Sequence, residues 1–164
     1  MVSDLIGWLR GRRGLSCGRP REVDVDRITR IYIKNVRAIK YVDLELSPFT
    51  VLIGDNGAGK STIIECLEVL RKAAGASFFE QLYSIHGGLE GLLRKTAQML
   101  ELGVVIEDDA GEEPRIEYSF SLVPRAAGAV VHGERMLVGP MTKAKHPLIA
   151  LRRDASGGQM FDQT

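Results

Sequence analysis

An apolar segment, a glycine-rich turn and a helical pattern follow one another from Phe49 to Thr62, and this order constrains the fold more than any other feature. The residues from Gly54 to Ser61 fit the spacing G-x-x-x-x-G-K-[ST], which is typical of loops that bind phosphate. Phe49 to Ile53 has the composition of a strand, and the residues after the loop have helical spacing. The sequence therefore predicts an α/β fold in which a phosphate loop joins a strand to a helix that begins near Gly59.

The residue types in this loop suit a bound triphosphate. Backbone N–H groups converge on phosphate oxygens only where side chains leave room, which is the expected role of the three glycines. Lys60 would bring a positive charge to the β- and γ-phosphates, the Ser61 hydroxyl is placed to ligate Mg²⁺, and Thr62 can donate one more hydrogen bond. The predicted ligands are ATP and Mg²⁺, and a purely structural turn is the alternative. The predicted site comprises Gly54, Asp55, Asn56, Gly57, Ala58, Gly59, Lys60, Ser61 and Thr62.

Composition describes an ordinary globular chain of 164 residues, about one domain, with a net charge of +1. The start is basic, because residues 1–21 hold five arginines and a single acidic residue, Asp4. Cys17 and Cys66 form neither a disulfide framework nor a metal motif, which favours a reducing, cytoplasmic setting. No apolar run reaches the 18 residues of a membrane span. We expect a flexible basic arm over 1–27 and one lobe over 28–164.

The lobe divides into a phosphate-loop core (28–75), a helical segment (76–97) and a β-hairpin region (98–164). In the core we expect strands over Arg27–Val36 and Val42–Leu46, as an antiparallel pair before the phosphate-loop strand. In the loop helix, four apolar residues are expected on one face, away from the charged ones, and Gly75 ends the helix. These apolar residues are Ile63, Ile64, Leu67 and Leu70.

The later segments continue this pattern. Ser77 opens a capping box, which predicts a second helix to about Ile85, and one or two more helical turns follow over Leu89–Lys95. His86 lies between, and we expect an exposed turn residue there. Further strands are predicted over Met99–Glu107, Arg115–Val123, Ala129–His132 and Leu148–Arg152, with a polar turn over 154–158.

Three further patterns have simpler interpretations. Val104 to Asp108 has the form of an apolar strand ending in an acid that could hold Mg²⁺, but a hairpin explains it equally well. Ser156 to Gln159 resembles a signature that contacts the γ-phosphate in ABC-type ATPases, yet it lacks a preceding leucine and a following helix, so a polar turn is favoured. A small basic cluster could touch nucleic-acid phosphates, although a solvated face is favoured. It contains Lys143, Lys145, His146, Arg152 and Arg153.

The order of these motifs resembles the N-terminal lobe of the SMC/RecF/OLD branch of ABC-type ATPases, often classed as AAA-family ATPases. The resemblance rests on the Ile31-x-Ile33-x-Asn35-Val36-Arg37 motif, on Leu44-x-Leu46-x-Pro48, and on the loop with its Asn56-Gly57 pair, followed by Glu65 and Leu67. It is dense over residues 28–75 and loose after them. It implies a P-loop NTPase with a mixed sheet, in the form of an incomplete, N-terminal half of an ATPase head.

The resemblance also implies functional properties. Arg37 would help to hold the nucleotide, two ATP molecules would be sandwiched between two heads of a homodimer, and DNA would be a partner. Hydrolysis would need a Walker B strand and signature from a second lobe or subunit, so we assign no catalytic residue in this chain. The alternative is a non-enzymatic remnant, a partner-binding module that keeps the fold without turnover. A small-molecule kinase or GTPase would need an acceptor- or base-binding motif, and none is found downstream.

Overall fold

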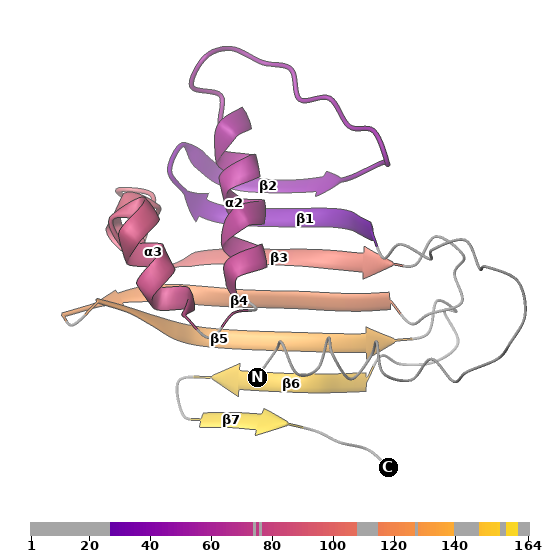
Figure 1. The fold of residues 1–164 in the computed structure, drawn as a ribbon, viewed down its shortest axis with the longest axis vertical. Helices are drawn as coiled ribbons and strands as arrows, with labels where there is room; N and C mark the ends of the chain where they lie inside the picture. Colours follow the sequence, from indigo (N-terminus) through magenta and orange to yellow (C-terminus); the bar gives the residue numbers. More distant parts are fainter. Residues whose placement is uncertain are drawn as a thin grey trace, which may run out of the picture.

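The computed structural model describes residues 27–73, 75, 77–107, 115–126, 128–139, 148–154 and 157–160. The strands in these ranges form one seven-stranded sheet in the order β2-β1-β3-β4-β5-β6-β7, in which all neighbours pair antiparallel. Helices α2 and α3 cover one face (Figure 1). The strands are β1 (Arg27–Val36), β2 (Ile39–Glu45), β3 (Leu100–Glu107), β4 (Arg115–Arg125), β5 (Gly128–Gly139), β6 (Leu148–Asp154) and β7 (Gly157–Met160).

The sheet has one apolar and one polar face because its strands alternate. On β1, Ile31 and Ile33 are 0% exposed and lie under the helices, while Arg30 and Lys34 point to the opposite face. Alternation on β4 likewise buries Tyr118, Phe120 and Leu122. The expected antiparallel pair before the loop and the hairpins after the helices are confirmed. The turn between β3 and β4, and Lys143, Lys145 and His146, lie outside the described residues.

Helix α2 (Lys60–Ala73) follows the phosphate loop as predicted, and Ile63, Leu67 and Leu70 pack inward as expected, but the most buried face is shifted away from Ile64. Its buried residues are Thr62, Cys66, Val69 and Leu70, whereas Ile64 is 57% exposed and Ile63 and Leu67 are half-buried. The 4-3 spacing of Thr62, Cys66 and Val69 is also a helical stripe. At the start of the helix, Gly59 packs closely against Ile39 of β2.

Helix α3 (Phe78–His86) is present where the sequence predicts it, although its start differs. The predicted capping box is wrong, because the Ser77 side chain makes no cap and instead accepts a hydrogen bond from Gln81 Nε2 at 2.8 Å. The helix ends at Gly87, whose left-handed backbone (φ 68°) allows its amide to reach the Tyr83 carbonyl at 3.1 Å. Of the further helical turns, the structure has one 3₁₀ turn, η1 (Leu89–Gly91).

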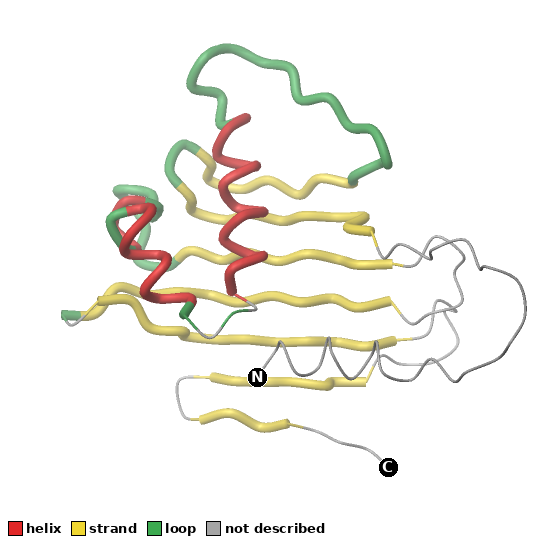
Figure 2. The backbone as a smooth tube through the Cα atoms, in the orientation of Figure 1, coloured by secondary structure: helices red, strands yellow, loops and turns green. Residues whose placement is uncertain are grey.

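The predicted phosphate-loop strand, Phe49 to Ile53, is not part of the sheet, and this corrects the expected mixed sheet. The chain leaves β2 and arcs beyond the sheet edge before it enters α2 (Figure 2). A local turn directs it outward, since Thr50 Oγ1 accepts from the Ser47 amide at 3.0 Å and donates to the Ser47 carbonyl at 3.1 Å. A strand also needs a neighbour for its backbone groups, and none of the described strands pairs with this segment.

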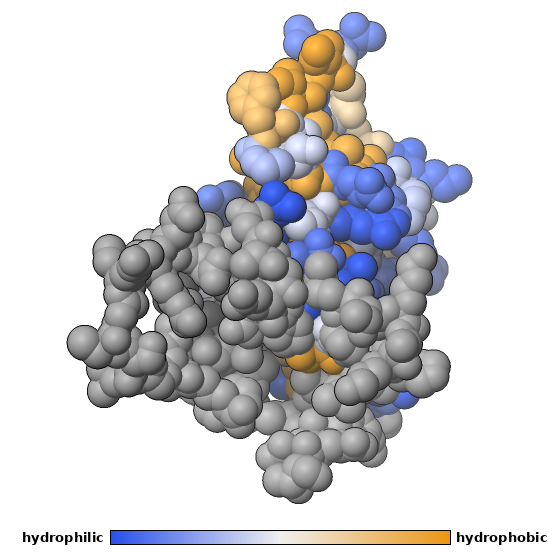
Figure 3. All heavy atoms as spheres, turned by 90° about the vertical axis from the view of Figure 1, so that its right-hand side faces the viewer, coloured by the Kyte–Doolittle hydropathy of each residue, from blue (hydrophilic) through white to orange (hydrophobic). Residues whose placement is uncertain are grey.

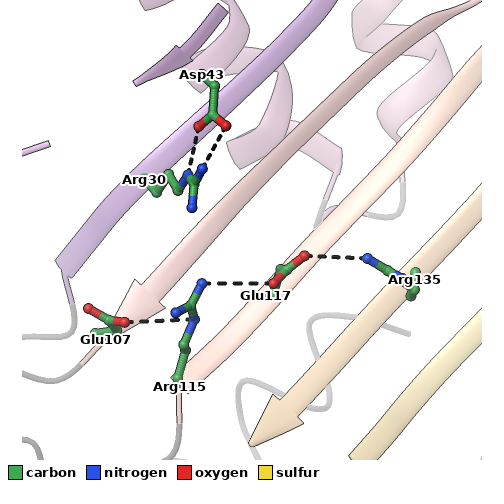
Figure 4. A network of polar contacts seen from close by, with 6 residues as sticks. All are labelled: Arg30, Asp43, Glu107, Arg115, Glu117 and Arg135. Carbon is green, nitrogen blue, oxygen red and sulfur yellow. Dashed lines mark hydrogen bonds and ion pairs between the residues drawn. The ribbon is translucent and has the colours of Figure 1, made fainter. Parts of the chain in front are cut away.

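The polar face carries a network of ion pairs rather than a single-sign patch. Arg30 binds Asp43 through two hydrogen bonds of 2.6 and 2.7 Å, and Arg115 bridges Glu107 and Glu117 (Figure 4). Arg30, Asp43, Arg115 and Glu117 line an open groove of about 400 Å³. Glu107 lies at the end of β3 in an antiparallel arrangement, as the hairpin interpretation predicts, and Gly157 to Gln159 lie in strand β7 rather than in a turn or a helix.

Candidate phosphate-binding site

The loop is exposed from Gly54 to Ala58 and buried at Gly59, and two of its glycines shape it. Gly57 and Gly59 have φ angles of +84° and +96°, a region that side chains disfavour. Nothing lies within 4 Å of the position that a Gly57 Cβ would take, whereas a Cβ on Gly59 would lie 2.9 Å from Ile39 Cγ1. The first glycine therefore leaves room for a ligand, and the second lets the loop pack on β2.

Lys60 holds the loop closed around its own ammonium group. Its Nζ donates to the carbonyls of Gly54 at 2.6 Å and Asp55 at 2.8 Å, while the Ala58 amide donates to the Asp55 carbonyl at 3.2 Å. A lysine ammonium has three donors, so one remains for an anion. The positive charge thus sits inside the curve of the loop, where phosphate oxygens would need it.

The start of α2 adds further donors. The first amides of a helix have no intrahelical acceptor and lie at the positive end of its dipole, which favours a bound anion. Ser61 is exposed, so its hydroxyl is available as a ligand, whereas Thr62 is only 7% exposed and lies on the side of α2 that faces the sheet. These residues fit a nucleoside triphosphate with Mg²⁺. The metal ion would neutralise phosphate charge when bound. Among the described residues, no cluster of three His, Cys, Asp or Glu side chains could hold a metal by itself.

The Arg37 side chain contacts Glu65 on the loop helix, and this contact was not predicted from the sequence. It occupies the turn between β1 and β2 with φ +47°, its Nη1 lies 2.9 and 2.8 Å from the two carboxylate oxygens of Glu65, and its Nε donates to the Gly91 carbonyl at 3.1 Å. The Arg37 amide also donates to the Leu92 carbonyl at 2.8 Å. One signal for this contact was in the sequence, because Glu65 follows Ser61 by four residues and so shares its face of the helix.

His86 differs from the expected exposed turn residue. It is the last residue of α3 and is half-buried, and its Nε2 atom is buried without a hydrogen-bond partner among the described residues. Burial lowers the pKa of His86, the nearby Glu65 raises it, and Lys72 and Arg37 lower it, so the net direction is down. The imidazole of His86 is therefore neutral at pH 7, close to the Arg37–Glu65 pair.

Apolar side chains around the loop are exposed. The exposed fraction is 84% for Phe49, 61% for Val51, 92% for Ile53 and 57% for Ile64, which lies on the second turn of α2. The hydrophobic atoms that gather at the top of the molecule in Figure 3 lie where Figure 1 places this segment. Clusters of exposed apolar side chains mark interaction surfaces in globular proteins. No helix in the described part of the chain has the length and apolar character needed to cross a membrane.

Comparisons with known proteins found similarity to an ATPase family and to curated relatives. Residues 27–128 match the family described as AAA ATPase domain. The chain is 31% identical over 102 residues to the DNA replication and repair protein RecF of Klebsiella pneumoniae, and 30% identical over 102 residues to RecF of Escherichia coli O1:K1, covering 55% of this chain and 27% of each relative. It is also 40% identical over 43 residues to the OLD nuclease of Thermus scotoductus, covering 26% of this chain and 8% of that relative. The chain thus spans about a quarter or less of the length of these relatives.

Proposed function

We propose that this chain, which belongs to the AAA ATPase domain family and is related to RecF and OLD proteins, binds Mg-ATP through Gly54 to Thr62. The observation that carries the proposal is the conformation of the loop. Gly57 and Gly59 have positive φ angles, and the Lys60 ammonium at the start of α2 is held by the loop carbonyls of Gly54 and Asp55. Lys60 and the loop amides would bind the phosphates, and the exposed Ser61 hydroxyl would hold the metal ion.

Substitution of Lys60 tests this proposal. Lys60→Ala removes a charge-assisted contact worth about 1.5–3 kcal/mol, so the affinity for Mg-ATP should fall by roughly 10- to 150-fold. Lys95→Ala is a matched control, since Lys95 is an exposed lysine in a turn after η1. Isothermal titration calorimetry of the three proteins measures the affinities. Equal affinity in wild type and Lys60→Ala would refute the role of the loop.

Hydrolysis, in this proposal, requires a second lobe or subunit that brings the acidic and signature residues. The exposed apolar segment from Phe49 to Ile53 supports this, because a strand with such side chains is stable only between neighbouring strands. The completed head would form a nucleotide-sandwiched homodimer and act in DNA transactions or phage defence in the cytoplasm. The names of the relatives, one of which is a DNA replication and repair protein, support the DNA partner.

The second candidate is a non-enzymatic module that keeps the phosphate-loop fold and binds a partner. The same four exposed apolar side chains favour it, since they suit a partner protein whether or not nucleotide is turned over. Neither candidate should hydrolyse ATP alone, so a measurement of ATP turnover by the purified chain distinguishes both candidates from a self-sufficient enzyme. Turnover by the 164 residues alone, lost in Lys60→Ala, would contradict both the requirement for a second lobe and the non-enzymatic module.

A further inference from the structure

We propose that Glu65 is a positioning residue that holds the Arg37 guanidinium beside the phosphate loop, an inference that rests on the proposed ATP site. Two contacts connect the β1–β2 turn to the start of the loop helix. Ile39 packs against Gly59 at the end of the loop, and Arg37, two residues earlier, reaches Glu65 one helical turn beyond Ser61. The arginine is therefore held on the helix that begins the phosphate site.

Two hydrogen bonds fix the guanidinium and leave Nη2 available for a ligand. Its Nε donates to the Gly91 carbonyl and its Nη1 to Glu65, so acceptors from two different elements fix the plane of the group. Among the described residues, Nη2 has no recorded partner. Since an arginine side chain has many rotamers, two fixed donors remove most of the ordering cost that a phosphate contact through Nη2 would otherwise carry.

Helix geometry places Glu65, and the guanidinium bound to it, on the face of α2 that carries Ser61. Residues four apart in a helix lie on one face with about 5–6 Å between their Cβ atoms, which applies to Ser61 and Glu65. Both are accessible, with Ser61 exposed and the Glu65 side chain 32% exposed. Glu65 itself is not expected to contact the nucleotide, because its carboxylate would repel the phosphates and is already neutralised by Arg37.

A double-mutant cycle tests the inference with Mg-ATP as the probe. Glu65→Gln keeps the shape of the side chain but removes its charge, and we expect about 3- to 10-fold weaker Mg-ATP binding in calorimetry, a fraction of the loss of a direct charged contact. Arg37→Ala should weaken binding at least as much. In the Arg37→Ala background, Glu65→Gln should have no further effect, because the residue acts only through Arg37.

Glu68→Gln is the matched control. Glu68 lies on the same helix and pairs with Arg71 at 3.0 Å, so its loss should leave the affinity within about twofold, the small effect expected at an exposed pair. Urea unfolding of each variant without nucleotide separates positioning from stability, since a merely structural Glu65 would change the unfolding midpoint and not the coupling with Arg37.

Four results would overturn the inference. Tighter binding by Glu65→Gln would mean that Glu65 competes with phosphate for Arg37, and an undiminished effect in the Arg37→Ala background would mean that it acts independently. Unchanged affinity in Glu65→Gln, with Lys60→Ala still defective, would remove the role of Glu65 and leave the proposed function intact. Absence of Lys60-dependent binding in the wild type would instead refute the proposed function, and the inference with it.

Discussion

Gly59 connects the phosphate loop to the sheet, so substitution of Gly59 by alanine should be far more harmful than its size suggests. The residue has φ +96°, where an alanine costs about 1–2 kcal/mol. The added Cβ would also lie 2.9 Å from Ile39 Cγ1 and 3.3 Å from Ile39 Cδ1, and such overpacking costs about 1–3 kcal/mol. The expected loss in the free energy of unfolding is therefore about 2–5 kcal/mol.

Gly57→Ala separates the two contributions. Gly57 has a similar φ of +84°, but nothing lies within 4 Å of the Cβ position, so only the backbone cost of about 1–2 kcal/mol should appear. Urea unfolding followed by circular dichroism measures both. At a slope near 2 kcal/mol/M, Gly59→Ala should lower the midpoint by roughly 1–2.5 M and Gly57→Ala by roughly 0.5–1 M.

Ile39→Ala completes the cycle. Removing both Ile39 carbon atoms that an alanine at 59 would approach should make Gly59→Ala less costly by about 1–3 kcal/mol than in the wild-type background. Equal losses for Gly57→Ala and Gly59→Ala, or additive effects of Gly59→Ala and Ile39→Ala, would refute the packing argument and with it the anchoring of α2 on β2.

Two further predictions concern Tyr32 on the polar face of the sheet and the buried thiol of Cys66. Gly103 on β3 lies beneath the Tyr32 ring with no room for a Cβ, so Gly103→Ala should destabilise the fold by about 1–3 kcal/mol in urea unfolding, and a neutral result would show that Tyr32 is free to move. Burial raises the pKa of the Cys66 thiol from 9.0 to about 12, so the folded state binds this proton more tightly than the unfolded state. Its stabilisation is fully present below pH 9 and is lost as the pH rises from 9 towards 12, which predicts a steeper fall of stability above pH 9 in wild type than in Cys66→Val. Equal slopes in the two proteins would contradict this.

Local sequence patterns were sufficient to predict a segment where its conformation depends only on neighbouring residues. The alternation of Ile31 and Ile33 gave β1 its bounds and its buried face, and the glycine spacing gave the loop and the start of α2. Hairpin strands were predictable for the same reason, because period-two alternation depends on the strand alone. The capping box at Ser77 failed because its hydroxyl had a competing partner in Gln81, four residues later.

Contacts between distant segments were not predictable in this way. Two apolar stripes of α2 were compatible with its sequence, and packing against the strands and α3 buries the one through Cys66 and Val69. The pairing of Arg37 with Glu65 depends on distant acceptors, since the Arg37 amide donates to the Leu92 carbonyl and the Arg37 Nε donates to the Gly91 carbonyl.

The sequence by itself determined the glycine-rich loop, the helix that follows it and the paired strands β1 and β2 before it, since these depend on backbone conformations and periodicities that neighbouring residues specify. Only the tertiary structure decided that Phe49 to Ile53 stays outside the sheet and that Glu65 holds Arg37. A strand forms only where another strand accepts its hydrogen bonds, and a long side chain takes one rotamer only where distant partners fix it. Both conditions are set by segments far away in the chain.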